Sequence, residues 1–177
     1  EHRMCGIVGL FLKDKSMESQ LGALLTDMLI TMTDRGPDSA GIAIYGGEVP
    51  DNAKLTVQSD TPEIDFLDLK SELEKTIQGG LKIRVQSTHA VLELQTDQMG
   101  KARTALKSIR PNIRVMSTGE SLEIYKEVGL PKDVASRFNL KNMSGSHGIG
   151  HTRMATESAV TTMGAHPFNT GIDQCLV

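Results

Sequence analysis

The feature that most constrains the fold is a run of alternating and helical hydrophobic patterns between residues 54 and 115. Polar and hydrophobic residues alternate at the start, in the middle and at the end of this run, which predicts four strands. Two stretches between them repeat hydrophobic residues at three- and four-residue steps, with Phe66, Leu69, Leu73 and Ile77 in the first and Met99, Ala102, Leu106 and Ile109 in the second. Thr61-Pro62 can begin the first helix, Gly79-Gly80 can end it, and Pro111 can end the second.

The predicted order is β-α-β-β-α-β, which is that of the ferredoxin-like arrangement, a four-stranded antiparallel sheet with two helices on one face. We therefore predict that residues 48–118 form an inserted ferredoxin-like βαββαβ subdomain. This insertion offers little chemistry, because His89 is its only histidine and no metal-ligand spacing stands out. Two roles stay open for it: a docking or spacer module, or small-molecule sensing on its sheet face or at a pairing edge.

The residues on either side of the insertion predict a second unit that contains both helices and strands. The segment 5–12 is apolar and β-prone, suited to a strand buried on both faces. Ser16 can cap a helix that stops near Gly36-Pro37, with an apolar stripe of Leu21, Leu24, Leu25, Met28, Leu29 and Met32. Further strands are predicted at 40–45, 121–126 and 148–153. In the last of these, His151 and Arg153 point the same way and Thr152 points the opposite way.

Four short motifs stand in this second unit. In chain order they are Met4-Cys5-Gly6-Ile7-Val8-Gly9, Asp34-Arg35-Gly36-Pro37-Asp38-Ser39-Ala40-Gly41, Gly148-Ile149-Gly150-His151-Thr152-Arg153-Met154-Ala155-Thr156 and Ala165-His166-Pro167-Phe168. Together they resemble the class II glutamine amidotransferases, which have the fold of the N-terminal-nucleophile hydrolases. The resemblance covers residues 5–47 and about 119–177. The whole chain is similar to the amidotransferase-like subunit of glutamate synthase-like and N-methylglutamate synthase systems.

This resemblance implies an α/β (α+β) fold, the αββα sandwich of the N-terminal-nucleophile hydrolases, incomplete at the C-terminus. The family's oxyanion-hole asparagine-glycine pair and a later aspartate that grips the substrate amine are absent up to Val177. Loss of one oxyanion donor costs ~10² to 10³ in rate. We therefore expect the chain to be the N-terminal part of a longer protein and to be inactive in isolation.

Cys5 is the predicted catalytic residue. If the residues before it are removed, Cys5 carries a thiol as nucleophile and a free α-amine as the adjacent base, whose pKa is near ~8 in model peptides. Residues 1–4 are interpreted as a tag remnant or a propeptide with an initiator methionine. The simpler alternative for Cys5 is a buried cysteine in the first strand, and a disulfide between Cys5 and Cys175 would remove the nucleophile.

Arg153 is the predicted ligand of the substrate α-carboxylate, because its planar guanidinium can donate two parallel hydrogen bonds. By resemblance, Thr156 stands beside it and Arg35 lies near the nucleophile, although Arg35 could simply be a cation at a helix C-terminus. Glu157 departs from the family, which has a neutral or imidazole side chain at this position. If Glu157 faces the site, it would repel a carboxylate or attract an amine. His151 and His166 are expected to be structural.

Charge and composition limit the partners. The formal net charge is −3, with no block of lysine or arginine that would favour nucleic acid or a membrane surface. No run approaches the ~18 apolar residues of a transmembrane helix, and no signal peptide is visible, so we expect a cytoplasmic protein. Two cysteines fit a reducing compartment.

The expected function is that of a glutaminase domain that passes ammonia to a synthase. By resemblance, glutamine is the substrate and a glutamate-synthase-like subunit is the partner. No cofactor or metal is expected in this chain, and a flavin (FMN) would sit on the partner. A homo-oligomer stays open. The alternative is a non-catalytic regulatory or assembly subunit with a ligand- or partner-binding insertion.

Overall fold

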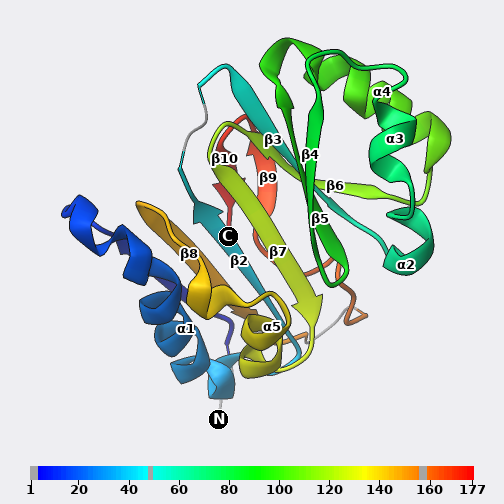
Figure 1. Cartoon of the computed structure of the whole chain (residues 1–177). Helices are drawn as coiled ribbons and strands as arrows, with labels where there is room; N and C mark the ends of the chain where they lie inside the picture. The colour runs from blue at the N-terminus through cyan, green and yellow to red at the C-terminus, as the bar shows by residue number, and fades with distance from the viewer. Residues whose placement is uncertain (1–3, 48–49, 156–158) are drawn as a thin grey trace.

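The computed structural model describes residues 4–47, 50–155 and 159–177, and two four-stranded antiparallel sheets dominate it (Figure 1). Sheet A has the strand order β1-β8-β2-β7, and sheet B has the order β4-β5-β3-β6. Helices accompany both sheets, so the predicted α+β class is confirmed. Among the helices of the described ranges, none is both long enough and apolar enough to cross a membrane.

Sheet A is built from segments that lie far apart in the sequence. Its strands are β1 (Gly6–Phe11), β8 (His147–Arg153), β2 (Ser39–Tyr45) and β7 (Leu122–Val128). Two helices, α1 (Leu21–Thr31) and α5 (Pro131–Arg137), cover one face (Figure 1). The stripe of α1 predicted from the sequence forms the core here, because Leu21, Leu25 and Leu29 are fully buried. The helical segment begins earlier than α1, with a 3-10 turn that Asp14, and not the predicted Ser16, caps through its side chain.

The opposite face of sheet A is only partly covered. A short hairpin of β9 (Phe168–Gly171) and β10 (Gln174–Leu176) packs on β2 and β7, where Cys175 joins a small cluster with Ala43 and Ile124. On the edge strand β1, Ile7 is 55% exposed and Phe11 is 64% exposed. The prediction that segment 5–12 is buried on both faces is therefore wrong. Its helix-side residues are buried, whereas the described residues leave its other side open.

Sheet B and its helices follow the predicted β-α-β-β-α-β order. The elements are β3 (Asn52–Gln58), α2 (Pro62–Asp65), α3 (Leu69–Leu73), β4 (Leu81–Gln86), β5 (His89–Gln95), α4 (Met99–Ile109) and β6 (Arg114–Gly119). The first predicted helix is split, because Asp68 adopts a left-handed conformation with φ of 55° between α2 and α3. Leu55 and Leu92 of the sheet pack against Leu73 of α3 and Leu106 of α4 in one core.

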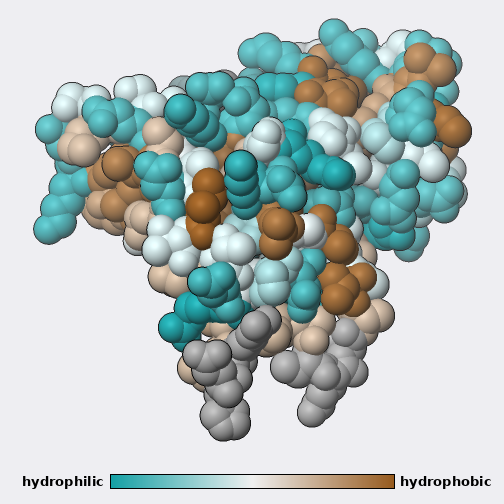
Figure 2. Space-filling model, turned by 90° about the horizontal axis from the view of Figure 1, so that it is seen from below, coloured by the Kyte–Doolittle hydropathy of each residue, from teal (hydrophilic) through white to brown (hydrophobic). Residues whose placement is uncertain are grey.

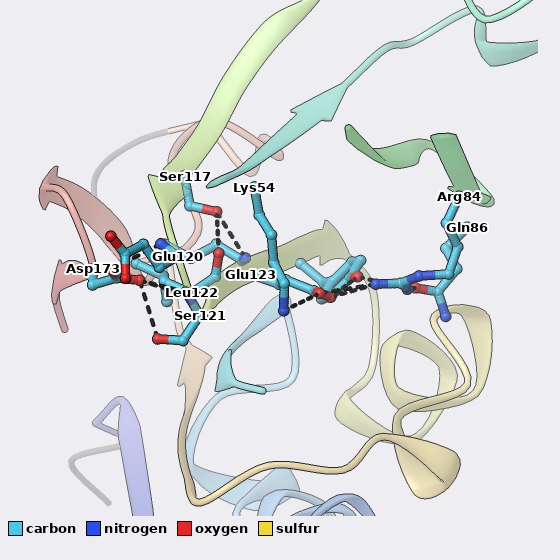
Figure 3. A network of polar contacts seen from close by, with 11 residues as sticks. Lys54, Arg84, Gln86, Ser117, Glu120, Ser121, Leu122, Glu123 and Asp173 are labelled. Atoms are coloured by element: carbon cyan, nitrogen blue, oxygen red, sulfur yellow. Dashed lines mark hydrogen bonds and ion pairs between the residues drawn. The ribbon is translucent and has the colours of Figure 1, made fainter. Parts of the chain in front are cut away.

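The other face of sheet B packs against β7 and α5 of sheet A. The Arg84 guanidinium donates two hydrogen bonds to the Glu123 carboxylate, of 2.9 and 2.8 Å, and Lys54 Nζ lies 3.3 Å from the same carboxylate (Figure 3). The buried His89 ring meets the Phe138 ring edge-on, with centroids 4.7 Å apart. We call this contact region, with Lys54, Arg84, His89, Glu123 and Phe138 at its centre, the junction.

A single carboxylate ties the β9–β10 hairpin to the turn between β6 and β7. Asp173 Oδ2 accepts a hydrogen bond from the backbone amide of Glu120, and its Oδ1 accepts from the amides of Ser121 and Leu122 (Figure 3). These bonds, together with the Ser121 hydroxyl, keep the pKa of Asp173 below its usual value although burial acts to raise it. The hairpin is thereby held against sheet A.

Candidate active site

Cys5 and Arg153 lie at the same end of neighbouring strands. Cys5 is exposed and directly precedes β1, and Arg153 is the last residue of β8. Gly6 pairs with Thr152 in the antiparallel register, so Cys5 and Arg153 each stand one residue beyond this pair. On the other side of β8, Arg153 pairs with Ser39 of β2. The nucleophile and the carboxylate ligand predicted from distant motifs are thus brought to one end of sheet A.

The second motif reaches the same end through Gly36. A Cβ atom at this position would come within 2.5 Å of the Thr152 carbonyl, so only a glycine allows this approach. Arg35 directly precedes Gly36 and is exposed at the end of the 3-10 helix Thr33–Arg35. Figure 2 views the molecule from this end and shows its hydrophobic residues as several small groups among polar ones.

Asp38 fixes the backbone that follows β8. Its amide donates a 3.1 Å hydrogen bond to the carbonyl of Arg153, and its carboxylate accepts a 2.8 Å bond from the amide of Ala155. The motif that contains Asp38 was recognised in the sequence, but this bracing role was not predicted. Thr156 and Glu157, two of the predicted substrate residues, lie outside the described residues.

Thr152 and Arg153 point to opposite faces of sheet A, as the alternation of a strand predicts. The Thr152 hydroxyl donates a 3.2 Å hydrogen bond to the carbonyl of Met32, on the side of α1. The Arg153 guanidinium lies on the other side and against Gly164, where a Cβ atom would be 2.8 Å from its Nη1. The segment after β8 therefore folds back to form a wall beside this guanidinium.

His151 and His166 pack ring against ring on this wall, with centroids 4.5 Å apart. Burial lowers the pKa of His151 to about 4, and the nearby His166 and Arg153 act in the same direction. Burial together with Lys126 and Arg153 also lowers the pKa of His166. The Nδ1 atoms of both rings are buried, and neither has a hydrogen-bond partner within the described part of the chain. Both rings are neutral at pH 7, so their contact is one of packing.

Lys126 is a functional candidate that the sequence reading missed. It is 2% exposed, and its ammonium donates hydrogen bonds of 2.8 and 3.2 Å to the carbonyls of Ala165 and Pro167. The same nitrogen lies 4.2 Å from the centre of the Phe168 ring, a cation–π contact. Burial lowers the pKa of Lys126 to about 8. Lys126 thus anchors the segment that carries His166, and the only sequence signal is its place on the Leu122–Ile124 side of β7.

Neither the cysteines nor the acidic residues supply an alternative centre in the described ranges. Cys5 and Cys175 are both free thiols, so the alternative of a disulfide between them is not realised. In these same ranges, no three residues among histidine, cysteine, aspartate and glutamate are grouped so that they could hold a metal ion.

Comparisons with known proteins point to the glutamine amidotransferases. The chain is 62% identical over 176 residues to the glutamine amidotransferase-like protein GlxB of Rhizobium meliloti, covering 98% of this chain and 58% of that protein. It is 33% identical over 182 residues to a putative glutamine amidotransferase of Methanothermobacter thermautotrophicus, covering 96% of this chain and 58% of that protein. A glutamine--fructose-6-phosphate aminotransferase of Methanosarcina mazei matches 30% of this chain and 8% of its own length at 45% identity.

No family model matches the chain. The chain spans 58% of the length of the first two relatives. The names of these relatives support a place for this chain among the glutamine amidotransferases.

Proposed function

We propose that the chain is a class II glutamine amidotransferase domain that releases ammonia from the side chain of glutamine. The observation that carries this proposal is the position of exposed Cys5 and of Arg153 at one end of neighbouring strands, set by the Gly6–Thr152 pair. The relatives named as glutamine amidotransferases support the same reaction.

The proposed chemistry needs Cys5 at the amino terminus of the mature chain. Its thiol attacks the carboxamide carbon of glutamine and passes its proton to the free α-amine, which delivers it to the amide nitrogen as the C–N bond breaks and ammonia leaves. A γ-glutamyl thioester forms on Cys5, and water then hydrolyses it to glutamate and restores the thiol. The Arg153 guanidinium binds the α-carboxylate of glutamine through two parallel hydrogen bonds. Thr156 and Arg35 complete the substrate site, and Glu157 adjusts its preference.

The proposed architecture assigns sheet A, α1 and α5 to one half of the αββα sandwich of the N-terminal-nucleophile hydrolases, formed by residues 5–47 and 119–177. A second sheet would cover the open side of β1, and the exposed Ile7 and Phe11 support such a cover. Residues 48–118 would form the ferredoxin-like insertion. The strand order β4-β5-β3-β6, with helices on one face, supports this assignment.

The proposed physiological role is to supply ammonia to a synthase. Ammonia is mostly protonated at neutral pH and is then a poor nucleophile, so direct transfer to a partner is an advantage. We propose a glutamate-synthase-like subunit as that partner, with FMN bound on the partner, and a cytoplasmic location for the complex.

A second candidate function is that of a non-catalytic regulatory or assembly subunit. The observation that favours it is the close packing of the insertion on β7, where His89, Arg84 and Lys54 all contact sheet A. A glutamine-mimicking electrophile separates the two functions. A glutaminase is expected to react at Cys5 and to be protected from the reaction by glutamine, whereas in a scaffold glutamine would not slow the labelling of the exposed Cys5 thiol.

The substitution Cys5→Ala tests the proposed activity. It is made in a protein of the full length of the relatives whose first residue is residue 5. Ammonia release from glutamine is expected to fall to background, because the nucleophile is removed. Cys175→Ala is the matched control and is expected to retain activity, because Cys175 lies in the β9–β10 hairpin. Glutaminase activity that survives Cys5→Ala would refute the assignment.

A further inference from the structure

A cavity of about 380 Å³ lies at the junction, at the end of β2 opposite to Arg153. Because β2 runs for seven residues from Ser39 to Tyr45, this cavity is about 20 Å from the end of sheet A that carries Cys5. Its lining residues come from both sheets and from the loop after α5. They include Lys54, Arg84, Gln86, Glu123, Asn142 and Ser144. We call it the junction cavity.

Two of the three charged groups of the junction cavity are largely removed from water. The side chains of Lys54 and Glu123 are each 9% exposed, and that of Arg84 is 51% exposed. Lys54 and Arg84 approach the Glu123 carboxylate from opposite sides (Figure 3). The Tyr125 hydroxyl donates a third, 2.5 Å hydrogen bond to the same carboxylate. Glu123 is therefore saturated by three donors.

This network does not balance its charge. Burial acts to raise the pKa of Glu123, but the Arg84 guanidinium, the Tyr125 hydroxyl and Lys54 outweigh it, so the carboxyl group stays ionised. Burial and the neighbouring Glu123 carboxylate raise the pKa of Tyr125 well above its usual value, so its hydroxyl stays neutral. Two cations thus share one anion among the described lining residues. A charge in a partly enclosed site is unfavourable unless it is paired.

The donors that remain open point to an anionic ligand. An ammonium carries three N–H donors, and Glu123 is the only ion-pair partner of Lys54 in the described part of the chain. Asn142 and Ser144 add an amide and a hydroxyl to the wall that the loop after α5 provides, and one N–H of the Asn142 amide already donates to Asn139 Oδ1. An adjoining cavity, also of about 380 Å³, adds Lys82 and Glu93, which pair with each other at 3.2 Å and leave the excess of one positive charge unchanged.

We propose that the junction cavity binds a small metabolite through a carboxylate or phosphate group, which Lys54 and Arg84 hold. The volume lies in the range of small-molecule sites, about 300–1,000 Å³. The single excess positive charge favours an anionic group over a neutral or cationic one. This binding site is separate from the proposed glutaminase site and does not depend on it.

Isothermal titration calorimetry on the full chain tests this proposal, with inorganic phosphate and glutarate as the two anionic probes and glutaramide as the uncharged analogue of glutarate. Saturable binding of one or both anions is expected, and none of glutaramide. If only phosphate binds, the natural ligand carries a phosphate group, and if only glutarate binds, it carries a carboxylate. If neither anion binds, the proposal is wrong.

Two substitutions locate the binding. Lys54→Met is expected to weaken it about tenfold or more, because a charge-assisted hydrogen bond is lost. Lys101→Met, at an exposed position on α4, is the control and should leave the affinity unchanged.

Because Lys54 is buried and its replacement can disturb folding, Asn142→Asp provides a second test at an exposed position. The added negative charge at the rim of the cavity should weaken anion binding several-fold, whereas Asn112→Asp, exposed at the end of α4 and outside the cavity, should not. Anion binding that Lys54→Met and Asn142→Asp both leave unchanged would place the ion elsewhere and overturn the proposal.

Discussion

The two sheets of this molecule differ in how their faces are covered. Sheet B has a helical layer on one face and the junction on the other, so that its central strands β5 and β3 are covered on both faces. Sheet A has a helical layer on one face, but within the described residues the other face is left open over the edge strand β1. The difference shows where polar groups are used for stability and where they remain available for chemistry.

Sheet B uses its charged and polar side chains to attach itself to sheet A. Arg84, His89 and Gln86 all contact β7 or the end of α5. Sheet A instead ends at Cys5 and Arg153, with the thiol exposed. The polar side chains of sheet B are thus used in its attachment to sheet A, whereas the Cys5 thiol at the end of sheet A is accessible.

The largest loss of stability is expected from Glu123→Gln, which would break the ion pairs of the junction. Removal of one partner of a buried ion pair costs about 3–5 kcal/mol, and the half-exposed Arg84 places the expected loss near the lower end. Urea unfolding at pH 7 measures it. Glu93→Gln is the control, since its partner Lys82 is 80% exposed and the loss should stay below about 1 kcal/mol. Equal losses for both variants would show that the junction is not a special source of stability.

Acid should weaken the same junction through His89. Burial lowers the pKa of this fully buried imidazole to about 3, with Lys126 and Arg137 acting in the same direction. The unfolded chain takes up a proton below pH about 6.5, whereas the folded chain does not. The stability is therefore complete above pH 6.5 and falls as the pH drops toward 3. Between pH 7 and pH 5 the loss due to His89 is about 2 kcal/mol.

The variant His89→Phe isolates this contribution, because phenylalanine keeps an aromatic ring against Phe138 but cannot be protonated. Its free energy of unfolding is expected to change about 2 kcal/mol less than that of the wild type between pH 7 and pH 5. Denaturant unfolding at the two pH values measures the difference. An unchanged pH dependence would mean that His89 becomes protonated without loss of the junction.

The sequence predicted the helices and strands well, but it predicted poorly which faces of the strands are buried. The two sheets show why. The strands around Leu55 and Ile83 were predicted because alternation is a local property. The burial of Ile7 was predicted wrongly, because it depends on which distant segment covers β1. The same limit applies to Lys126 and Asp173, whose partners lie 39 or more residues away in the sequence. Cys5 and Arg153 were found because their motifs, and not their surroundings, identified them.

A smaller loss of stability is expected from Asp173→Asn, where the β9–β10 hairpin is tied to sheet A. In Asp173→Asn, an amide NH2 group would face the Glu120 amide or the two amides at Ser121 and Leu122, and one accepting oxygen would be lost. The loss is expected to be about 1 kcal/mol, since the site is half-exposed. Asparagine tolerates the φ of 53° at this position, so backbone strain does not confuse the result.

Hydrogen exchange of the backbone amides at 120–122 measures this change locally. Faster exchange at these amides is expected for Asp173→Asn, with little change in the core of sheet B. Asp97→Asn, at an exposed position before α4, is the matched control. If the exchange rates at 120–122 stay the same, the carboxylate does not hold the hairpin.

The smallest effect is expected on the open side of β1, from Phe11→Ser. Phe11 is 64% exposed and its nearest aromatic neighbour is His147, with ring centroids 5.7 Å apart, so the 177-residue chain should lose no more than about 0.5 kcal/mol. Val8→Ala, at a position 6% exposed on the helix side of the same strand, should cost clearly more. In a protein of the full length of its relatives, a second sheet over β1 would bury Phe11. The loss for Phe11→Ser should then rise to about 2 kcal/mol or more. Urea unfolding of both lengths measures the change, and an equally small loss in the longer protein would contradict the proposed sandwich.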